Sequence, residues 1–159
     1  MTQLVIDCGP LTLVWIPNLA APVSTRSQSG AFEMRCGTER IGSVSLVGTH
    51  PPHAVIGYEV IPEFRSRGFA SIAVAAVLAV APSFGFNVLT AQCRSNNAHS
   101  RRVLEKTGFT LSTAAPFWTN TGRSTKKRDM SLLFMVYQWI AVPILPLTEH
   151  IASAERHMK

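Results

Sequence analysis

The amino-acid sequence predicts one mixed α/β (α+β) domain, a mostly antiparallel central sheet of six to seven strands with flanking helices. First, the β-prone runs at residues 32–35, 41–47 and 54–61 are separated by short polar connectors, which favours an antiparallel meander. Second, residues 71–81 form a continuous apolar run that is typical of a buried helix. Third, residues 97–107 carry the start and stop signals of a second helix. A chain of 159 residues can bury the core that such a domain needs.

The composition excludes disorder for most of the chain, because 47% of the residues are hydrophobic and only 15% are charged. Acidic residues are scarce, so 15 Lys and Arg against 9 Asp and Glu give a formal charge of +6. A basic surface suits a phosphorylated cofactor, an acidic peptide or a nucleic acid, and we favour an ordinary basic protein over a nucleic-acid-binding one. Three widely spaced cysteines fit neither a disulfide framework nor a zinc cluster, so we expect a reducing cytoplasm and no metal. The first residues do not resemble a signal peptide.

The first part of the chain is predicted to consist of strands joined by turns. Gly9 and Pro10 separate two apolar runs, which indicates a hairpin or a bent strand. Residues 17–30 are rich in Pro, Ser and Gly and have no sustained period, so we expect a loop or at most a short helix there. The predicted strands cover residues 4–7, 11–16, 32–35, 41–47 and 54–61.

Helices and strands alternate after residue 62. Pro82 stops the helix predicted over 71–81, which at about 1.5 Å per residue is too short to cross a bilayer core of about 30 Å. Asn97 is the N-cap candidate of the second helix, and Gly108 is its left-handed stop. Further strands are expected at 88–93, 110–118 and 129–137. We therefore expect a single domain over residues 1–141 and a C-terminal tail over 142–159.

The segment between strand 54–61 and the helix that follows it suits a phosphate group. A loop at this place presents unpaired backbone N–H groups and the positive end of the helix dipole to one point. Gly68 allows close approach of the backbone and Ala70 keeps the first helical turn narrow, while Arg65 and Arg67 add positive charge. Glycine-containing turns after strands are common, so a structural turn that binds no anion is the alternative explanation of this pattern.

Two motifs in this order resemble those of the GNAT superfamily of N-acetyltransferases. Residues 57–70 (GYEVIPEFRSRGFA) resemble its acyl-coenzyme A signature, whose core is Arg or Gln, two residues, Gly, one residue and then Gly or Ala. Residues 97–109 (NAHSRRVLEKTGF) are similar to the second signature of the RimJ/RimL branch, the N-terminal acetyltransferases of ribosomal proteins. The resemblance covers about residues 41–109. It implies a sheet that splays into a V between the family's fourth and fifth strands.

The resemblance also implies acetyl-CoA (coenzyme A) as co-substrate and assigns residues to it. In the family the pantetheine arm pairs with the splayed strand, which here implies the backbone around Val60 and Ile61. Asn97 would bind the pantetheine amides and the Ser100 hydroxyl would meet the sulfur, although a plain N-cap and an ordinary first-turn serine explain them equally in structural terms. The pyrophosphate would lie on the loop amides of Arg65, Ser66, Arg67, Gly68, Phe69 and Ala70.

Acetyl transfer needs a base for the amine and a donor for the departing thiolate. Glu59 is the candidate base, directly or through water, because it lies on the cofactor-bearing strand; structural pairing with a nearby Arg is an equal alternative. Family members often carry a carboxylate four residues earlier, where this chain has Val55. Many use a tyrosine acid in the second signature, where this chain has Leu104. The resemblance to the RimJ/RimL branch therefore makes Ser100 the candidate acid.

Three functions remain open from the sequence. The first is an acetyl-CoA-dependent N-acetyltransferase that acts on a primary amine, of a protein N-terminus or a lysine, by direct attack in a ternary complex. The second is acetylation of a small amine or an aminoacyl-tRNA, and the third is a catalytically weak acyl-CoA-binding regulatory or interaction protein. RimJ/RimL-like proteins have two helices where only residues 17–30 are available here, so we expect an open acceptor site, or one that a second subunit completes. A homodimer would also cover exposed apolar strands near the C-terminus, and no membrane partner is expected.

Overall fold

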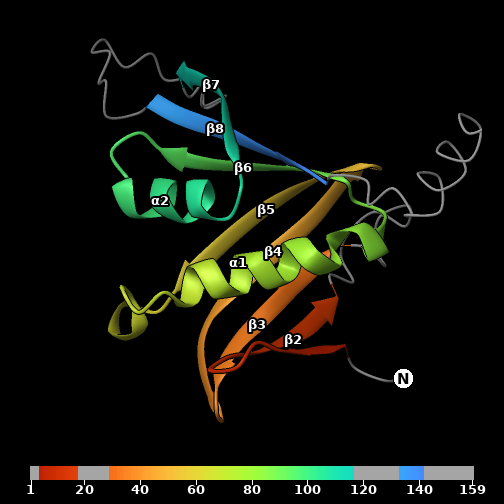
Figure 1. Ribbon diagram of the computed structural model, residues 1–159, viewed down its shortest axis with the longest axis vertical. Helices are drawn as coiled ribbons and strands as arrows, with labels where there is room; N and C mark the ends of the chain where they lie inside the picture. The colour runs from red at the N-terminus through yellow and green to blue at the C-terminus, as the bar shows by residue number, and fades with distance from the viewer. Residues whose placement is uncertain (1–3, 18–28, 117–132, 142–159) are drawn as a thin grey trace, which may run out of the picture.

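The computed structural model describes residues 4–17, 29–116 and 133–141. Within them it has eight strands and two α-helices, with short 3-10 turns at Pro62–Phe64 and Ala81–Phe84 (Figure 1). The strands are β1 (Val5–Asp7), β2 (Thr12–Pro17), β3 (Gly30–Cys36), β4 (Glu39–His50), β5 (His53–Val60), β6 (Val88–Arg94), β7 (Thr110–Pro116) and β8 (Leu133–Ile140). The helices are α1 (Phe69–Val80) and α2 (Ala98–Lys106).

All strands join one sheet in the order β1-β2-β3-β4-β5-β6-β8-β7. Strands β3 to β5 form the predicted antiparallel meander, which β1 and β2 extend, and among the described strands only β5 and β6 pair in parallel. The mixed, mostly antiparallel class is confirmed. The sheet has eight strands rather than six to seven, because Gly9 turns the N-terminal segment with φ +78° and separates β1 from β2 as a true hairpin.

The sheet opens between β5 and β6. These strands pair only where residues 53–55 meet residues 88–90, although both continue well beyond that point. Figure 1 shows them meeting at one end and diverging toward the end that carries the start of α1 and all of α2. Each strand keeps its partner on the outer side, β4 for β5 and β8 for β6, so the edges that face the gap carry unpaired backbone groups.

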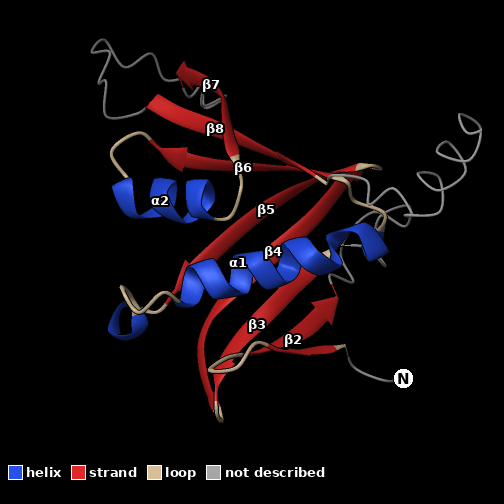
Figure 2. Cartoon of the chain, in the orientation of Figure 1, coloured by secondary structure: helices blue, strands red, loops and turns tan. Residues whose placement is uncertain are grey.

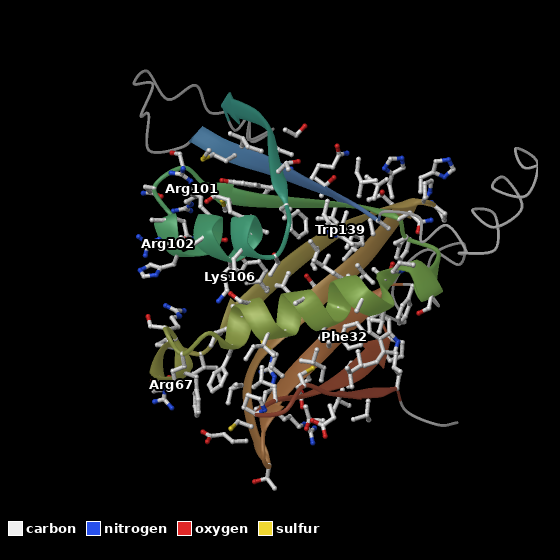
Figure 3. All side chains as sticks on the ribbon, in the orientation of Figure 1. Phe32, Arg67, Arg101, Arg102, Lys106 and Trp139 are labelled. Atoms are coloured by element: carbon white, nitrogen blue, oxygen red, sulfur yellow. The ribbon has the colours of Figure 1, made fainter. Side chains whose placement is uncertain are left out.

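The core lies between α1 and the sheet face that the helix crosses (Figure 2). Leu46 pairs with Ile56 in adjacent strands, and both side chains are buried on this face. Phe32 is fully buried below α1 (Figure 3). The helix begins two residues before the predicted start, because Gly68 takes the left-handed conformation at the N-cap, and Pro82 ends it as expected.

The opposite face of the sheet carries no helix among the described residues. Val47 and Val55 are paired neighbours on it and are 43% and 40% exposed. Strands β2 and β3 pair as far as Pro17 and Gly30, and most of the loop expected over residues 17–30 lies outside the described residues. Neither helix in the described ranges has the length and apolar character that a membrane crossing requires.

The last strand extends beyond its predicted C-terminal end, to Ile140 instead of Tyr137. The expected strand 88–93 is β6, whereas 110–118 is described only to Pro116 and the expected strand 129–137 is described as Leu133–Ile140. The end of β8 is set by its partner, because it pairs with β6 along its length until Ile140 lies opposite Val88. The predicted tail over 142–159 lies outside the described residues.

Candidate active site

The loop that leads into α1 has an unusual backbone. Ser66 has φ +61°, a left-handed conformation that is uncommon for a residue with a side chain, and Gly68 follows with φ +82°. Gly68 is the N-cap of α1 and has no side chain with which to cap it. The first N–H groups of the helix have no intrahelical acceptors, so the loop and the helix dipole together form a place for an anion.

This loop borders a cleft of about 600 Å³ that runs from β5 to α2. The residues predicted as site residues that line it are Glu59, Val60, Arg65, Ser66, Gly68, Phe69, Ala70, Asn97 and Ser100. The fold therefore brings together two segments that the sequence separates by almost thirty residues (about one βα unit). The other lining residues are Tyr58, Phe64, Ser71, His99, Arg102 and Val103.

Two predicted residues do not line the cleft. The Ile61 amide donates to the Ile41 carbonyl at 2.8 Å, so it faces β4 and not the gap. Arg67 lies over the Phe64 ring, with its guanidinium carbon 5.2 Å from the ring centre, and points from the outer side of the loop (Figure 3). Arg65 donates from Nε to the Val60 carbonyl at 2.8 Å, which ties the loop to the end of β5.

The start of α2 forms the second wall. Asn97 Oδ1 accepts a hydrogen bond from the Ser100 amide at 3.1 Å, as predicted for an N-cap. This bond fixes Ser100 in the first turn of α2, at the edge of the cleft. Leu104 is fully buried in the core, which explains why an apolar residue stands at that position. Cys93 on β6 is also buried, and burial raises the pKa of its thiol, so this thiol stays protonated near neutral pH.

Tyr58 reaches α2 from the opposite wall. Its hydroxyl oxygen lies 2.7 Å from Ser100 Oγ and also donates to the Ser100 carbonyl oxygen at 3.0 Å. Burial of the ring raises the pKa of Tyr58 to about 12, with a smaller opposing contribution from the bond to Ser100. The phenol is therefore neutral at physiological pH and acts only through hydrogen bonds.

Glu59 is the next residue of β5 and lies on the opposite face of the sheet from Tyr58. It pairs across the strands with Ser43, whose hydroxyl donates to Glu59 Oε1 at 3.2 Å. Arg40 lies 3.9 Å from the same oxygen, and the Glu59 side chain is 72% exposed. This carboxylate therefore has the arginine partner that a structural role would require, and it also borders the cleft.

The sequence reasoning missed the six other lining residues, of which Tyr58 and three residues of α2 matter most for the chemistry of the cleft. Tyr58 alternates with Ile56 and Val60 along β5, which could have placed it on the helix-facing side. His99 borders the cleft together with Arg102 and Val103. Spacings of three and four residues put these side chains on one helical face. Figure 3 shows Arg102 on α2 at the end of the molecule where the loop before α1 also lies.

The comparisons with known proteins agree with this geometry. The sequence profile of the acetyltransferase (GNAT) domain matches residues 15–110. The chain belongs to the GNAT acetyltransferase family. The uncharacterized N-acetyltransferase YoaA of Bacillus subtilis (strain 168) is 37% identical to this GNAT chain over 89 residues, 48% of each protein. The chain therefore spans about half the length of this relative.

Solved structures show the same GNAT fold. The apo form of RimL, the ribosomal L7/L12 alpha-N-protein acetyltransferase, superposes with a TM-score of 0.66 at 16% identity, covering 88% of this chain and 96% of RimL. RimL in complex with coenzyme A gives a TM-score of 0.62 at 21% identity, covering 75% of this chain and 66% of that one. At these identities the similarity establishes the architecture.

The cleft of this GNAT chain is chemically suited to a phosphorylated ligand. A Cβ built on Gly68 would meet no protein atom within 4 Å, so the space in front of the loop backbone is open. Arg65 and Arg102 border the cleft from its two walls and supply positive charge. The Ser100 hydroxyl and the unpaired edge of β5 border the same cleft. They offer hydrogen-bonding groups to the rest of a ligand whose phosphates lie at the loop.

Proposed function

We propose that the protein is an acetyl-CoA-dependent N-acetyltransferase that transfers the acetyl group to a primary amine of a protein N-terminus or a lysine. One observation carries this proposal: a single cleft joins the loop at the start of α1, with its free backbone amides, to the Ser100 hydroxyl at the place where β5 and β6 diverge. Family membership supports the reaction class, and the RimL structures support the fold that carries it.

The diphosphate of coenzyme A would lie on the backbone between Arg65 and Ala70, where its oxygens cap the free amides of α1. Arg102 on the other wall would add charge complementarity to the phosphates. The pantetheine arm would follow the unpaired edge of β5 at Val60, and would compete there with the Arg65 side chain for the Val60 carbonyl. The Asn97 side-chain oxygen already accepts a hydrogen bond from the Ser100 amide, so the Asn97 NH2 group would donate to the pantetheine arm.

Transfer requires a neutral amine beside the thioester carbon in a ternary complex. The nitrogen lone pair forms the N–C bond, and the C–S bond breaks with its electron pair on sulfur. The nitrogen gives up one proton, to Glu59 or to a water held by it, and the Ser100 hydroxyl donates a hydrogen bond to the departing thiolate. Glu59 and Ser100 come from opposite sides of the splayed strands, so the acceptor would approach from the sheet face that Glu59 occupies.

An extended acceptor fits that face best. Val47 and Val55 leave it apolar and accessible, and no helix among the described residues walls it. A polypeptide can lie across such a surface, whereas a small amine would find few enclosing contacts. This openness favours a protein or peptide acceptor over a small molecule.

The proposal is tested by offering acetyl-CoA with separate acceptor pools and following thiol release. The pools are peptides with a free N-terminus, N-terminally blocked peptides with lysine, small amines and aminoacyl-tRNA. We expect thiol release with a peptide pool and a mass gain of one acetyl group on that peptide. Release only with small amines or aminoacyl-tRNA assigns the alternative acceptor, and binding of coenzyme A without release from any pool assigns an acyl-CoA-binding regulatory role instead.

A pair of matched variants tests Glu59 as the base. Glu59→Gln removes the carboxylate at the cleft, and general-base loss typically lowers kcat by about 100-fold or more. Glu33→Gln is the control, because Glu33 also pairs with Arg40, at 3.4 Å, and does not border the cleft. Equal, small effects of the two substitutions would show that Glu59 has only the structural role of pairing with Arg40.

A further inference from the structure

Tyr58 and Ser100 form a hydroxyl pair that joins the two walls of the cleft across a sequence separation of 42 residues. We propose that Tyr58 is a positioning residue for acetyl transfer, which directs the proton of the Ser100 hydroxyl toward the leaving sulfur. This inference rests on the proposed function. It differs from the superfamily arrangement described above, in which a tyrosine of the second signature serves as the acid, because that position is the buried Leu104 here.

The geometry allows two arrangements of the hydrogens on the same heavy atoms. The Tyr58 phenol has one hydrogen and two acceptors within reach, the Ser100 carbonyl oxygen at 3.0 Å and Ser100 Oγ at 2.7 Å. When the phenol donates to the carbonyl, Ser100 can donate back to the phenol oxygen and its own hydrogen faces Tyr58. When the phenol donates to Oγ, the Ser100 hydrogen no longer faces Tyr58 and can turn to the neighbouring Cys93 sulfur or to the cleft.

A negative sulfur in the cleft selects the second arrangement. A hydrogen bond to a charged acceptor is about twice as strong as one between neutral groups. The phenol then donates to Oγ while Oγ donates to sulfur, and the chain of two hydroxyls strengthens both bonds. The hydrogen bond from the Ser100 amide to Asn97 Oδ1 fixes the backbone of Ser100, so only its hydroxyl group rotates.

Tyr58 keeps its own proton throughout. Its pKa of about 12 lies far above the value of about 8.5 that is usual for a thiol, so transfer of the phenolic proton to the thiolate is unfavourable. The atoms balance without it: the amine nitrogen loses its proton to Glu59 or water, and the thiolate leaves hydrogen-bonded to Ser100 and takes a proton from solvent. Tyr58 thus acts through Ser100 and not as an acid.

A double-mutant cycle distinguishes a Tyr58 that acts through Ser100 from a Tyr58 that contributes to catalysis independently of Ser100. We expect Ser100→Ala to lower kcat about 100-fold, as for loss of one donor to a developing anion, and Tyr58→Phe to lower it about 10-fold. In the Ser100→Ala background Tyr58→Phe should cause no further loss, because the group it directs is absent. An additional tenfold loss in that background, or no loss in the wild-type background, overturns the proposal. Tyr58→Met serves the same cycle if the phenylalanine variant does not fold.

Tyr137→Phe is the matched control for the hydroxyl deletion. Tyr137 is the other tyrosine of the chain, is buried, and donates to Glu105 Oε1 at 3.1 Å on another face of α2. Its loss should lower thermal stability about as much as Tyr58→Phe does. It should leave kcat within about twofold of the wild type, since a purely structural hydroxyl changes stability and not the chemical step.

A binding measurement tests the same proposal without acetyl transfer, so that its failure is distinguishable from failure of the proposed function. The affinity for coenzyme A is compared with that for desulfo-coenzyme A, which lacks the thiol, as the pH rises toward about 8.5. A hydroxyl directed at sulfur favours the thiolate, so coenzyme A should gain up to about tenfold over the desulfo form in the wild type. Tyr58→Phe should lose this gain. An equal gain in both proteins would refute the positioning role.

Discussion

Gly68 offers the most direct test of the loop before α1. Its φ of +82° lies in the left-handed region, and a Cβ placed on it would enter open space in front of the loop. Gly68→Ala therefore has two separable effects. It strains the backbone of the free protein, and it places a methyl group where the proposed diphosphate would approach the amides.

The backbone effect is about 1 kcal/mol for an L-residue held in the left-handed region, which lowers the melting temperature by about 3 °C in a chain of this size. Gly68→Asp adds a negative charge. At about 5 Å and an effective dielectric constant near 20, one pair of like charges repels by about 3 kcal/mol, and exposure of the loop reduces this to about 2 kcal/mol. We expect the affinity for coenzyme A to fall about 30-fold or more.

Gly9 provides the control, because its φ is +78° and a Cβ on it also meets no atom within 4 Å. Gly9→Ala and Gly9→Asp should lower the melting temperature as the Gly68 variants do and leave the coenzyme affinity unchanged. Calorimetric titration with coenzyme A measures the affinity, and added salt should reduce the extra loss in Gly68→Asp. Unchanged affinity in both Gly68 variants would refute the placement of the diphosphate on this loop.

Two further predictions concern the wall opposite the loop. Asn97→Ala removes the acceptor of the Ser100 amide, so we expect the free energy of unfolding to fall by about 1 kcal/mol and the melting temperature by about 3 °C. Asn97→Ser retains a capping oxygen and should lower the stability less. Equal losses in the two variants would contradict the role of Asn97 as N-cap. In Tyr137→Phe the phenolate absorbance reports Tyr58 alone, and it should appear near pH 12 rather than 10. The pKa of Tyr58 in the folded protein lies above the unfolded value of 10.0, so its contribution to stability is complete below pH 10 and is lost as the pH rises through about 12. Ionisation of Tyr58 in the folded protein near pH 10 would contradict the burial of its ring.

The sequence was sufficient to predict several local features of the molecule, namely helix ends and turns. The Asn97 cap, the left-handed Gly108 after α2 and the stop of α1 before Pro82 depend on a few neighbouring residues, and each stands where it was expected. The meander of β3 to β5 followed for the same reason, since short connectors join strands that are neighbours in the sheet. The C-terminal end of β8 did not, because pairing with β6 determines it.

The tertiary structure alone decided how the site is assembled. The alternation of apolar residues can assign Tyr58 to one face of β5, but it cannot predict which side chain Tyr58 contacts. The contact with Ser100 arises because β5 diverges from β6 and α2 lies beside the gap between them. The rotation of α2 likewise decides that Leu104 is buried while His99 and Arg102 border the cleft. Sequence periodicity fixes the relative directions of side chains on one element, whereas contacts between elements depend on long-range packing that no short window of sequence contains.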